Sequence, residues 1–273
     1  ELERGSVSSD TLYHSIANLA YCQFMAGQTF HQVKLISKRQ LADLIWEFRF
    51  EKPADFRYVA GQFAQFQIPS DDTFVLRSYS IASAPPSGRL DFCIKLVPGG
   101  RASEYLSKLN TGDQVNISAP RGFFVCRDAS LPRYFIATGT GVAPLMAMIE
   151  DARDGGAVDL LFGVRSEADL FWVDRFEAMK ARSDKFNFRI TLSGAGDSWA
   201  GLRGRVTEHL EIDQAARTGQ ADVVHHLAPD GGHQLFTEAD RAVDRGPEAL
   251  QLCRAQEKIV RLGLVVAVHE YPD

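Results

Sequence analysis

Two short runs about sixty residues apart carry the residue types in this sequence that could do chemistry. The first is Arg77-Ser78-Tyr79-Ser80, which places a guanidinium, an aromatic ring and hydroxyls on one extended segment. The second is Gly139-Thr140-Gly141-Val142-Ala143-Pro144, which follows an apolar run. An apolar strand that leads into a glycine turn and then a helix presents backbone N–H groups to a pyrophosphate. The two runs together indicate a flavin site followed by a dinucleotide site, and hence electron transfer between two bound cofactors.

Composition limits the function classes. A chain of 273 residues is long for a single core and predicts two domains. The net charge of −5, with no Lys/Arg run, argues against nucleic acid as the main partner. No stretch approaches the roughly 20 apolar residues of a membrane span. The 4 cysteines are far apart, without metal-ligand spacing, which predicts reduced thiols of a cytoplasmic protein and no metal site.

The hydrophobic periodicity changes near residue 130. Short runs of alternating apolar and polar residues, bounded by Pro and Gly, predict antiparallel strands up to that point, with one helical insert over Ala102–Leu109. They predict a closed antiparallel β-barrel. Beyond it, strands alternate with helices, which predicts an α/β domain with a parallel sheet. We therefore predict a flavin-binding barrel over 31–129 and a dinucleotide-binding α/β domain over 130–273, and we assign no role to 1–30.

The ordered motifs resemble the ferredoxin–NADP reductase superfamily, especially the reductase modules that serve bacterial oxygenases. The resemblance covers roughly residues 31 to 210. Its motifs are, in chain order, Gly61-Gln62-Phe63, Arg77-x-Tyr79-Ser80, Gly99-Gly100-Arg101-Ala102-Ser103, Pro120-Arg121-Gly122-Phe123-Phe124, Gly139 to Pro144, Phe162-Gly163-Val164-Arg165 and the run Trp199 to Val206.

The residue types of the first run suit a flavin. Arg77 can meet the FAD pyrophosphate with a planar charged fork, and Ser78 lies beside it. Tyr79 would offer its ring to the flavin plane, and Ser80 would hydrogen-bond near the flavin N5, which becomes N–H on reduction. Tyr79 and Ser80 are thus the predicted catalytic residues. The alternative is a surface Arg–Asp pair beside a half-buried Tyr, which would be preferred if Arg77 or Tyr79 stood alone.

A second anchor for the same pyrophosphate is predicted where the barrel's helix begins. Gly99 and Gly100 form a turn, and the helix N–H groups that follow, at Ala102 and beyond, point at an anion together with the Ser103 hydroxyl. A second anchor favours FAD that stays bound over flavin that is used as a diffusing substrate.

The glycine turn at Gly139 is weaker evidence alone, because Pro144 replaces the third glycine of a dinucleotide fingerprint. A plain strand–helix turn could use Gly139 and Gly141 for positive φ. The preceding apolar strand and a Pro near the first helical turn favour ligand binding. The resemblance implies that Thr140 lies beside the nicotinamide and that Pro144 starts the helix.

Three further residues complete the predicted nucleotide site. Gly163 and Arg165 would lie at the carboxyl end of the next strand, where ligands of open α/β sheets collect. Arg165 could equally be a solvated loop charge. Ser193 ends the third strand, and the five residues after it, through Ser198, hold Asp197 and no cation. This favours NADH, with NADPH left open because Arg203 and Arg205 follow closely.

The sequence departs from the family pattern from residue 222. The family's Cys-Gly is missing after the strand-like run Asp222–Leu227, and Cys253 could be either a displaced version or a helical core residue. The histidines His225, His226 and His233 lack the Cys or acidic residues that would frame a metal site. The segment around 261–271 resembles the family's closing strand.

The reaction predicted from these residues is hydride transfer from NADH or NADPH to FAD. The electrons would then go singly to an acceptor such as a ferredoxin or an oxygenase component. No C-x4-C-x2-C motif occurs in the sequence, so an iron–sulfur cluster would be on another protein or on a missing segment. One alternative is a free-flavin or ferric reductase of the same superfamily. The other is a non-catalytic binding protein with a degenerate nicotinamide site.

Overall fold

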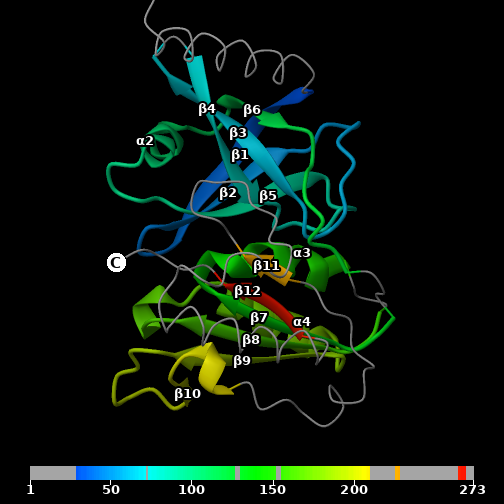
Figure 1. Cartoon of the computed structure of the whole chain (residues 1–273), viewed down its shortest axis with the longest axis vertical. Coiled ribbons are helices and arrows are strands. Elements are labelled where there is room, and N and C mark those ends of the chain that lie inside the picture. Colours follow the sequence, from blue (N-terminus) through cyan, green and yellow to red (C-terminus); the bar gives the residue numbers. More distant parts are fainter. Residues whose placement is uncertain are drawn as a thin grey trace, which may run out of the picture.

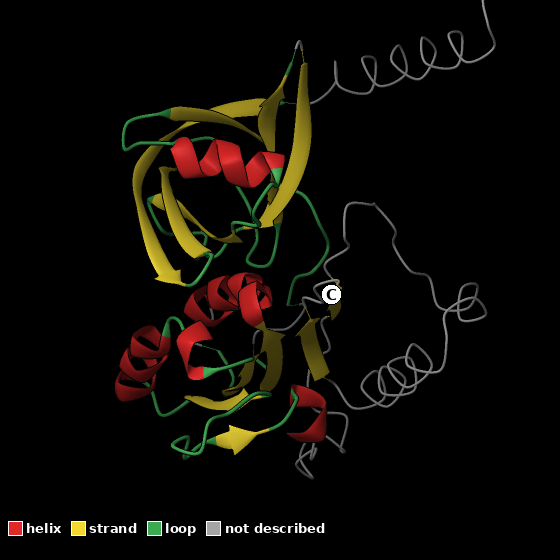
Figure 2. Ribbon diagram, turned by 90° about the vertical axis from the view of Figure 1, so that its left-hand side faces the viewer, coloured by secondary structure: helices red, strands yellow, loops and turns green. Residues whose placement is uncertain are grey.

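The computed structural model describes residues 29–71, 73–126, 130–151, 155–209, 225–227 and 264–268. The described part of the chain contains two six-stranded sheets, one antiparallel and one parallel. Helix α3 lies between them in Figure 1, and the side view in Figure 2 shows the same layering. None of the described helices has the length and apolar character that crossing a membrane requires.

The antiparallel sheet has the strand order β4-β3-β6-β1-β2-β5. An antiparallel bridge between Ile81, the residue after β4, and Phe92 of β5 joins its two edges. The predicted antiparallel fold of this half is therefore confirmed. Its strands are β1 (Phe30–Ala42), β2 (Ile45–Glu51), β3 (Phe63–Ser70), β4 (Thr73–Ser80), β5 (Arg89–Lys95) and β6 (Gln114–Ser118).

Alternation of side chains along these strands builds the core of the barrel. Phe50, Phe66 and Phe92 are completely buried and meet edge to face, with ring centroids 4.9 to 6.0 Å apart. Helix α2 (Arg101–Lys108) covers this core with Ala102 and Leu106. The predicted helical insert is confirmed, beginning one residue earlier than expected.

The second sheet has the order β10-β9-β8-β7-β12-β11, and all its neighbouring strands run parallel. It confirms the predicted α/β half. Its strands are β7 (Arg133–Thr138), β8 (Val158–Val164), β9 (Phe186–Leu192), β10 (Leu202–Arg203), β11 (His225–Leu227) and β12 (Leu264–Val268). The last two place pieces of the atypical tail in the sheet, whereas Cys253, His233 and residues 1–28 lie outside the described residues.

The described part of this half also contains several helical segments. They are α3 (Val142–Asp151), α4 (Val173–Arg182) and the 3-10 turns η1 (Gly139–Gly141), η2 (Glu167–Asp169) and η3 (Val206–His209). The expectation that Pro144 starts the helix is wrong, because α3 begins at Val142 directly after η1. Pro144 still lies in the first turn, where its missing N–H has no intrahelical partner to lose.

Gly61 marks the place where α3 meets the barrel. Its φ is +101°, and a Cβ atom there would lie 2.0 Å from the Phe124 carbonyl oxygen and 2.3 Å from Met148 Cε. Only glycine therefore lets the segment around Phe124 and helix α3 approach the barrel this closely.

We expect Gly61→Ala to destabilise the protein more than Gly112→Ala, although both glycines have φ near +100°. A Cβ at Gly112 has no heavy atom within 4 Å, so that variant measures the cost of the backbone conformation alone. Overpacking should add about 1–3 kcal/mol at Gly61. Urea unfolding of both variants tests this, and equal midpoints would contradict the packing argument.

Candidate functional site

Strand β4 presents the first run of candidate residues at the edge of the antiparallel sheet. Since neighbouring side chains of a strand point to opposite faces, Arg77 and Tyr79 share one face and Ser78 and Ser80 share the other. The strand ends at Ser80. A flat ligand can therefore contact both the Tyr79 ring and the Ser80 hydroxyl only at this end of the strand.

Arg77 is exposed, and its Nη1 donates a hydrogen bond to the carbonyl oxygen of Leu76 at 2.9 Å. No described carboxylate forms an ion pair with it, which argues against the surface Arg–Asp alternative within the described part of the chain. Its guanidinium is available to an anionic ligand such as a pyrophosphate.

Tyr79 is held by the barrel on one side. Its ring meets Phe66 edge to face, with centroids 5.2 Å apart, and packs against the barrel core. Burial raises the pKa of Tyr79 to about 12, and the charge of Arg77 offsets part of this rise. The phenol is therefore neutral at physiological pH. The contact with Phe66 and the barrel core thus holds the ring of Tyr79, the residue predicted to stack on the flavin, in place from one side.

The turn before α2 fits an anion. Gly99 has φ +72°, and a Cβ there would meet nothing within 4 Å, so the corner is open. The Val97 N–H donates to Ser103 Oγ at 2.7 Å, and Gly100 N–H donates to the Val97 carbonyl at 3.0 Å. The Ser103 hydroxyl hydrogen takes no part in that bond and can be donated to a ligand. The Ala102 side chain lies in the core, so only its backbone could reach one.

The second run forms η1 at the carboxyl end of β7. Gly139 has φ +48°, Thr140 is half-buried, and Gly141 and Pro144 are buried. The turn also contacts strand β5 of the barrel, which is the strand that Ile81 bridges directly after Ser80. The fold therefore brings the two predicted runs to the same barrel strand.

The other predicted nucleotide residues gather at the same edge of the parallel sheet. Gly163 pairs in register with Thr138 at the end of β7. Ser193 N–H donates to the Val164 carbonyl at 3.1 Å, and Gly194 N–H donates to the Arg165 carbonyl at 2.7 Å. Arg165 and Ser193 are both exposed, as a ligand contact requires.

Gly163 has a packing reason to be glycine. A Cβ there would lie 2.5 Å from Val206 Cγ1 on η3, and the residue is buried. Val206 occupies the space that a side chain at this position would need, so any ligand contact of Gly163 would be through its backbone.

The turn after Ser193 contains no basic residue of its own, but the side chain of Arg203 lies against it. The guanidinium of Arg203 donates to the carbonyl oxygens of Gly196 at 3.0 Å and Trp199 at 2.9 Å. Longer contacts of 3.2 and 3.4 Å reach the carbonyls of Asp197 and Ala195. The sequence left open whether Arg203 or Arg205 reaches this turn, and the structure shows that Arg203 does.

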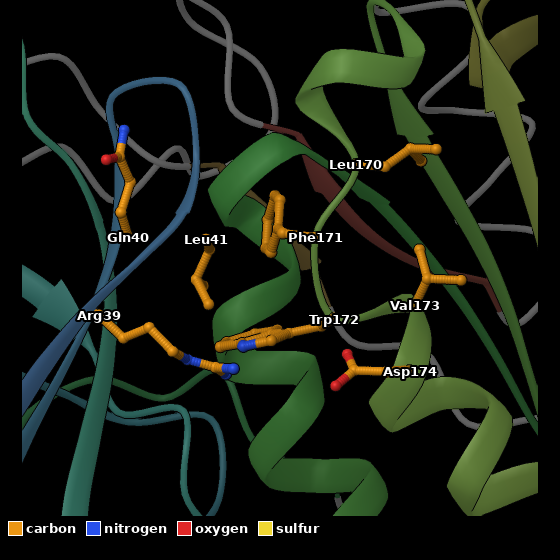
Figure 3. A pocket seen from close by; sticks show the side chains of 8 residues that line it. All are labelled: Arg39, Gln40, Leu41, Leu170, Phe171, Trp172, Val173 and Asp174. Atoms are coloured by element: carbon orange, nitrogen blue, oxygen red, sulfur yellow. The ribbon is translucent and has the colours of Figure 1, made fainter.

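Sequence reasoning missed a polar cluster where the two halves meet. Glu47 of β2 accepts hydrogen bonds from Trp172 and Arg175 of the second half. A cleft of about 340 Å³ beside it is drawn in Figure 3. No sequence signal pointed to Glu47, since an acidic residue in an alternating strand normally faces solvent. The cleft is lined by Arg39, Gln40, Leu41, Leu170, Phe171, Trp172, Val173 and Asp174.

Comparison with known proteins agrees with the fold. Residues 32–125 match the family of oxidoreductase FAD-binding domains, and residues 135–225 match the oxidoreductase NAD-binding domains. The crystal structure of a ferredoxin NADP+ reductase from Neisseria gonorrhoeae with bound FAD and NADP has a TM-score of 0.67. At 21% identity, over 88% of this chain and 98% of that one, it supports the fold alone.

Two relatives in sequence are closer. Ferredoxin–NADP reductase B of Sorangium cellulosum is 40% identical over 205 residues, which are 72% of this chain and 84% of that protein. The toluate 1,2-dioxygenase electron transfer component of Pseudomonas putida is 31% identical over 202 residues, 72% of this chain but only 59% of that protein. The chain thus spans a little over half of that oxygenase component.

Both halves carry the cofactor domains that the two runs predicted, in the predicted order. The open turn at Gly99 and the exposed guanidinium of Arg77, which pairs with no described carboxylate, fit the FAD pyrophosphate. The glycine turn Gly139–Gly141 at the end of β7 fits a nicotinamide nucleotide. The chain belongs to the ferredoxin–NADP reductase family and is an NAD(P)H-dependent FAD oxidoreductase.

Proposed function

We propose that this protein takes a hydride from NADH onto FAD and delivers the electrons to a separate acceptor protein, a ferredoxin or an oxygenase component. The observation that carries the proposal is the shared barrel strand, since β5 contacts the glycine turn and is bridged to the residue after Ser80. Hydride transfer needs donor and acceptor atoms about 3–3.5 Å apart, so the two sites must adjoin. The names of the two relatives support both classes of acceptor.

The barrel residues would hold and orient the flavin. Bound FAD supplies the redox chemistry, accepting a hydride and releasing electrons one at a time. Arg77 and the first N–H groups of α2, with Ser103, hold the pyrophosphate. Tyr79 would lie against the ring, and the Ser80 hydroxyl would hydrogen-bond near N5.

The second half would hold the nicotinamide nucleotide. The N–H groups of η1 and the start of α3 face its pyrophosphate, and Thr140 lies beside the nicotinamide. Arg165 and Ser193, exposed at the carboxyl ends of β8 and β9, face the adenosine part. We propose the domain limits 31–129 and 130–273 for these two functions. The cytoplasm is the proposed compartment, on the dispersed cysteines of the sequence.

One experiment separates this proposal from its alternatives. The purified protein should be yellow after gel filtration, and NADH added without oxygen should bleach the flavin band. A colourless protein that reduces added free flavin would favour a free-flavin or ferric reductase. A yellow protein that NADH and NADPH leave oxidised, and that reduces neither cytochrome c nor ferricyanide, would favour a non-catalytic binding protein.

We expect Arg77→Ala to weaken FAD binding about tenfold to a hundredfold, because a hydrogen bond to a charged group contributes about 1.5–3 kcal/mol. Flavin fluorescence on dilution measures the dissociation constant. Arg182→Ala is the matched control, since Arg182 is also exposed and also bonds a local carbonyl, that of Ala178 at 3.1 Å on α4. Equal FAD affinity of the Arg77 variant and the parent would remove Arg77 from the site.

We expect a higher kcat/KM for NADH than for NADPH. Asp197 is exposed on the turn after Ser193, and a carboxylate there repels a 2′-phosphate. The donors of Arg203 are engaged by backbone carbonyls of the same turn. Measuring both nucleotides at equal ionic strength tests this.

The competing outcome rests on the same arginine. An NADPH preference that disappears in Arg203→Gln would show that Arg203 leaves the carbonyls to bind the 2′-phosphate. The name of the Sorangium cellulosum relative, which mentions NADP, makes this comparison the sharpest one to perform.

A further inference from the structure

A buried carboxylate that belongs to neither predicted cofactor run lies between the two halves. Glu47 is in the middle of β2 on the outward face of the barrel, yet its side chain is only 2% exposed. Its neighbours on that face, Ile45 and Cys93, belong to the core that also contains α3 and α4. The second half therefore covers Glu47.

The two oxygens of Glu47 face different halves of the protein. Oε1 accepts hydrogen bonds from Trp172 Nε1 at 3.1 Å and from Arg175 Nη1 at 3.3 Å, both in the nucleotide half. Oε2 lies 3.0 Å from Arg49 Nη2 and 3.4 Å from Arg39 Nη2, both in the barrel. Glu47 thus receives directed bonds from both sides of the junction.

Trp172, which donates one of these bonds, has a left-handed backbone. Its φ is +59°, in the left-handed region, and the residue is only 2% exposed. A large residue keeps such a backbone only where its surroundings determine it, and such strain gathers at functional positions. Figure 3 shows its ring at the wall of the cleft, with the Arg39 side chain pointing toward it from β1.

Arg175, which bonds Glu47, also forms an ion pair with a residue of helix α3. Its Nη2 lies 2.6 Å from Glu150 Oε1, and its guanidinium stacks 4.8 Å from the Trp172 ring centre. Glu150 is near the end of α3, the helix that begins directly after the η1 glycine turn. One rigid helix therefore connects this cluster to the turn proposed to hold the nicotinamide nucleotide.

Stability alone is a poor reason for such a cluster. Burying a carboxylate and its partners costs desolvation, and apolar residues of similar volume often stabilise a protein as well or better. Directed hydrogen bonds from an indole and a guanidinium instead permit one relative placement of the two halves, whereas apolar surfaces can slide.

We propose that Glu47, through Trp172 and Arg175, is a positioning residue that fixes the nicotinamide half against the flavin half for hydride transfer. This inference rests on the proposed function. Because a misplacement of about 1 Å can slow such a reaction about a hundredfold, a residue that contacts neither cofactor can control its rate.

The test is Glu47→Gln, which keeps the size of the side chain and removes its charge. We expect the FAD content to stay at the parent value and flavin reduction at saturating NADH to slow about 10- to 100-fold in stopped flow. The dissociation constant for NADH should change less than about threefold, because the binding residues are untouched. The long-wavelength absorption of stacked nicotinamide and flavin should weaken, which a loss of stability alone would not cause.

Asp91→Asn is the matched control. Asp91 is a buried barrel carboxylate that bonds Arg89 and lies 3.7 Å from Arg49, and none of its described polar contacts is to the nucleotide half. Its reduction rate should fall clearly less than that of Glu47→Gln, since Asp91 shares the partner Arg49 with Glu47 but does not itself join the halves. An equal slowing in Asp91→Asn, or parental rate and absorption in Glu47→Gln, would overturn the proposal.

Trp172→Phe covers the case in which Glu47→Gln fails to fold. It removes the indole N–H and keeps an aromatic ring, so we expect slower reduction with unchanged FAD content. A parental rate in this variant would also overturn the positioning role. A parent protein that neither NADH nor NADPH reduces would instead overturn the proposed function, so the two failures are distinguishable.

Discussion

Enclosure of helix α3 between two sheets is the constraint on which the rest of the structure depends. Every residue from Val142 to Ile149 is buried, so the helix has no polar face to present to a ligand. Anion binding at its start must therefore come from backbone N–H groups of the turn Gly139–Gly141 and the first helical turn, which need no polar side chain. The same enclosure requires Gly61, because the Met148 side chain lies where a Cβ would be.

Two kinds of contact join the halves, and they do different things. The apolar contacts of α3 with the barrel remove surface from water and stabilise the junction, but they are not directional. The bonds of Glu47 to Trp172 and Arg175 are directional and contribute little net free energy after desolvation. An enzyme that holds its hydride donor and acceptor on separate domains needs both, because affinity between the domains does not fix their relative placement.

Local pattern was enough to predict most of the elements, and long-range contacts explain what it could not predict. Alternation and turn residues predicted the antiparallel barrel and located its helix α2 to within one residue at each end, since these signals belong to each segment itself. The two motif runs, Arg77–Ser80 and Gly139–Pro144, were sufficient to predict a flavin and a nicotinamide nucleotide as the cofactors. Glu47 could not be found, because its burial depends on a half of the chain more than a hundred positions away. The fold-back of Arg203 likewise depends on a turn whose carbonyls no motif describes.

Preorganisation links the folding of the two cofactor sites to their chemistry. The Val97 N–H bond to Ser103 Oγ fixes the hydroxyl before any anion arrives, and the carbonyls of Gly196 and Trp199 fix the guanidinium of Arg203. Groups held in this way lose less conformational entropy on binding, so their contacts contribute more affinity. Their occupied bonds also limit what they can do: Ser103 keeps a hydrogen to donate, whereas Arg203 must exchange carbonyls for a phosphate. In the proposed barrel site the Ser103 hydroxyl is therefore in place before a ligand binds, whereas in the proposed nucleotide site the choice between NADH and NADPH would depend on the carbonyl bonds that Arg203 gives up.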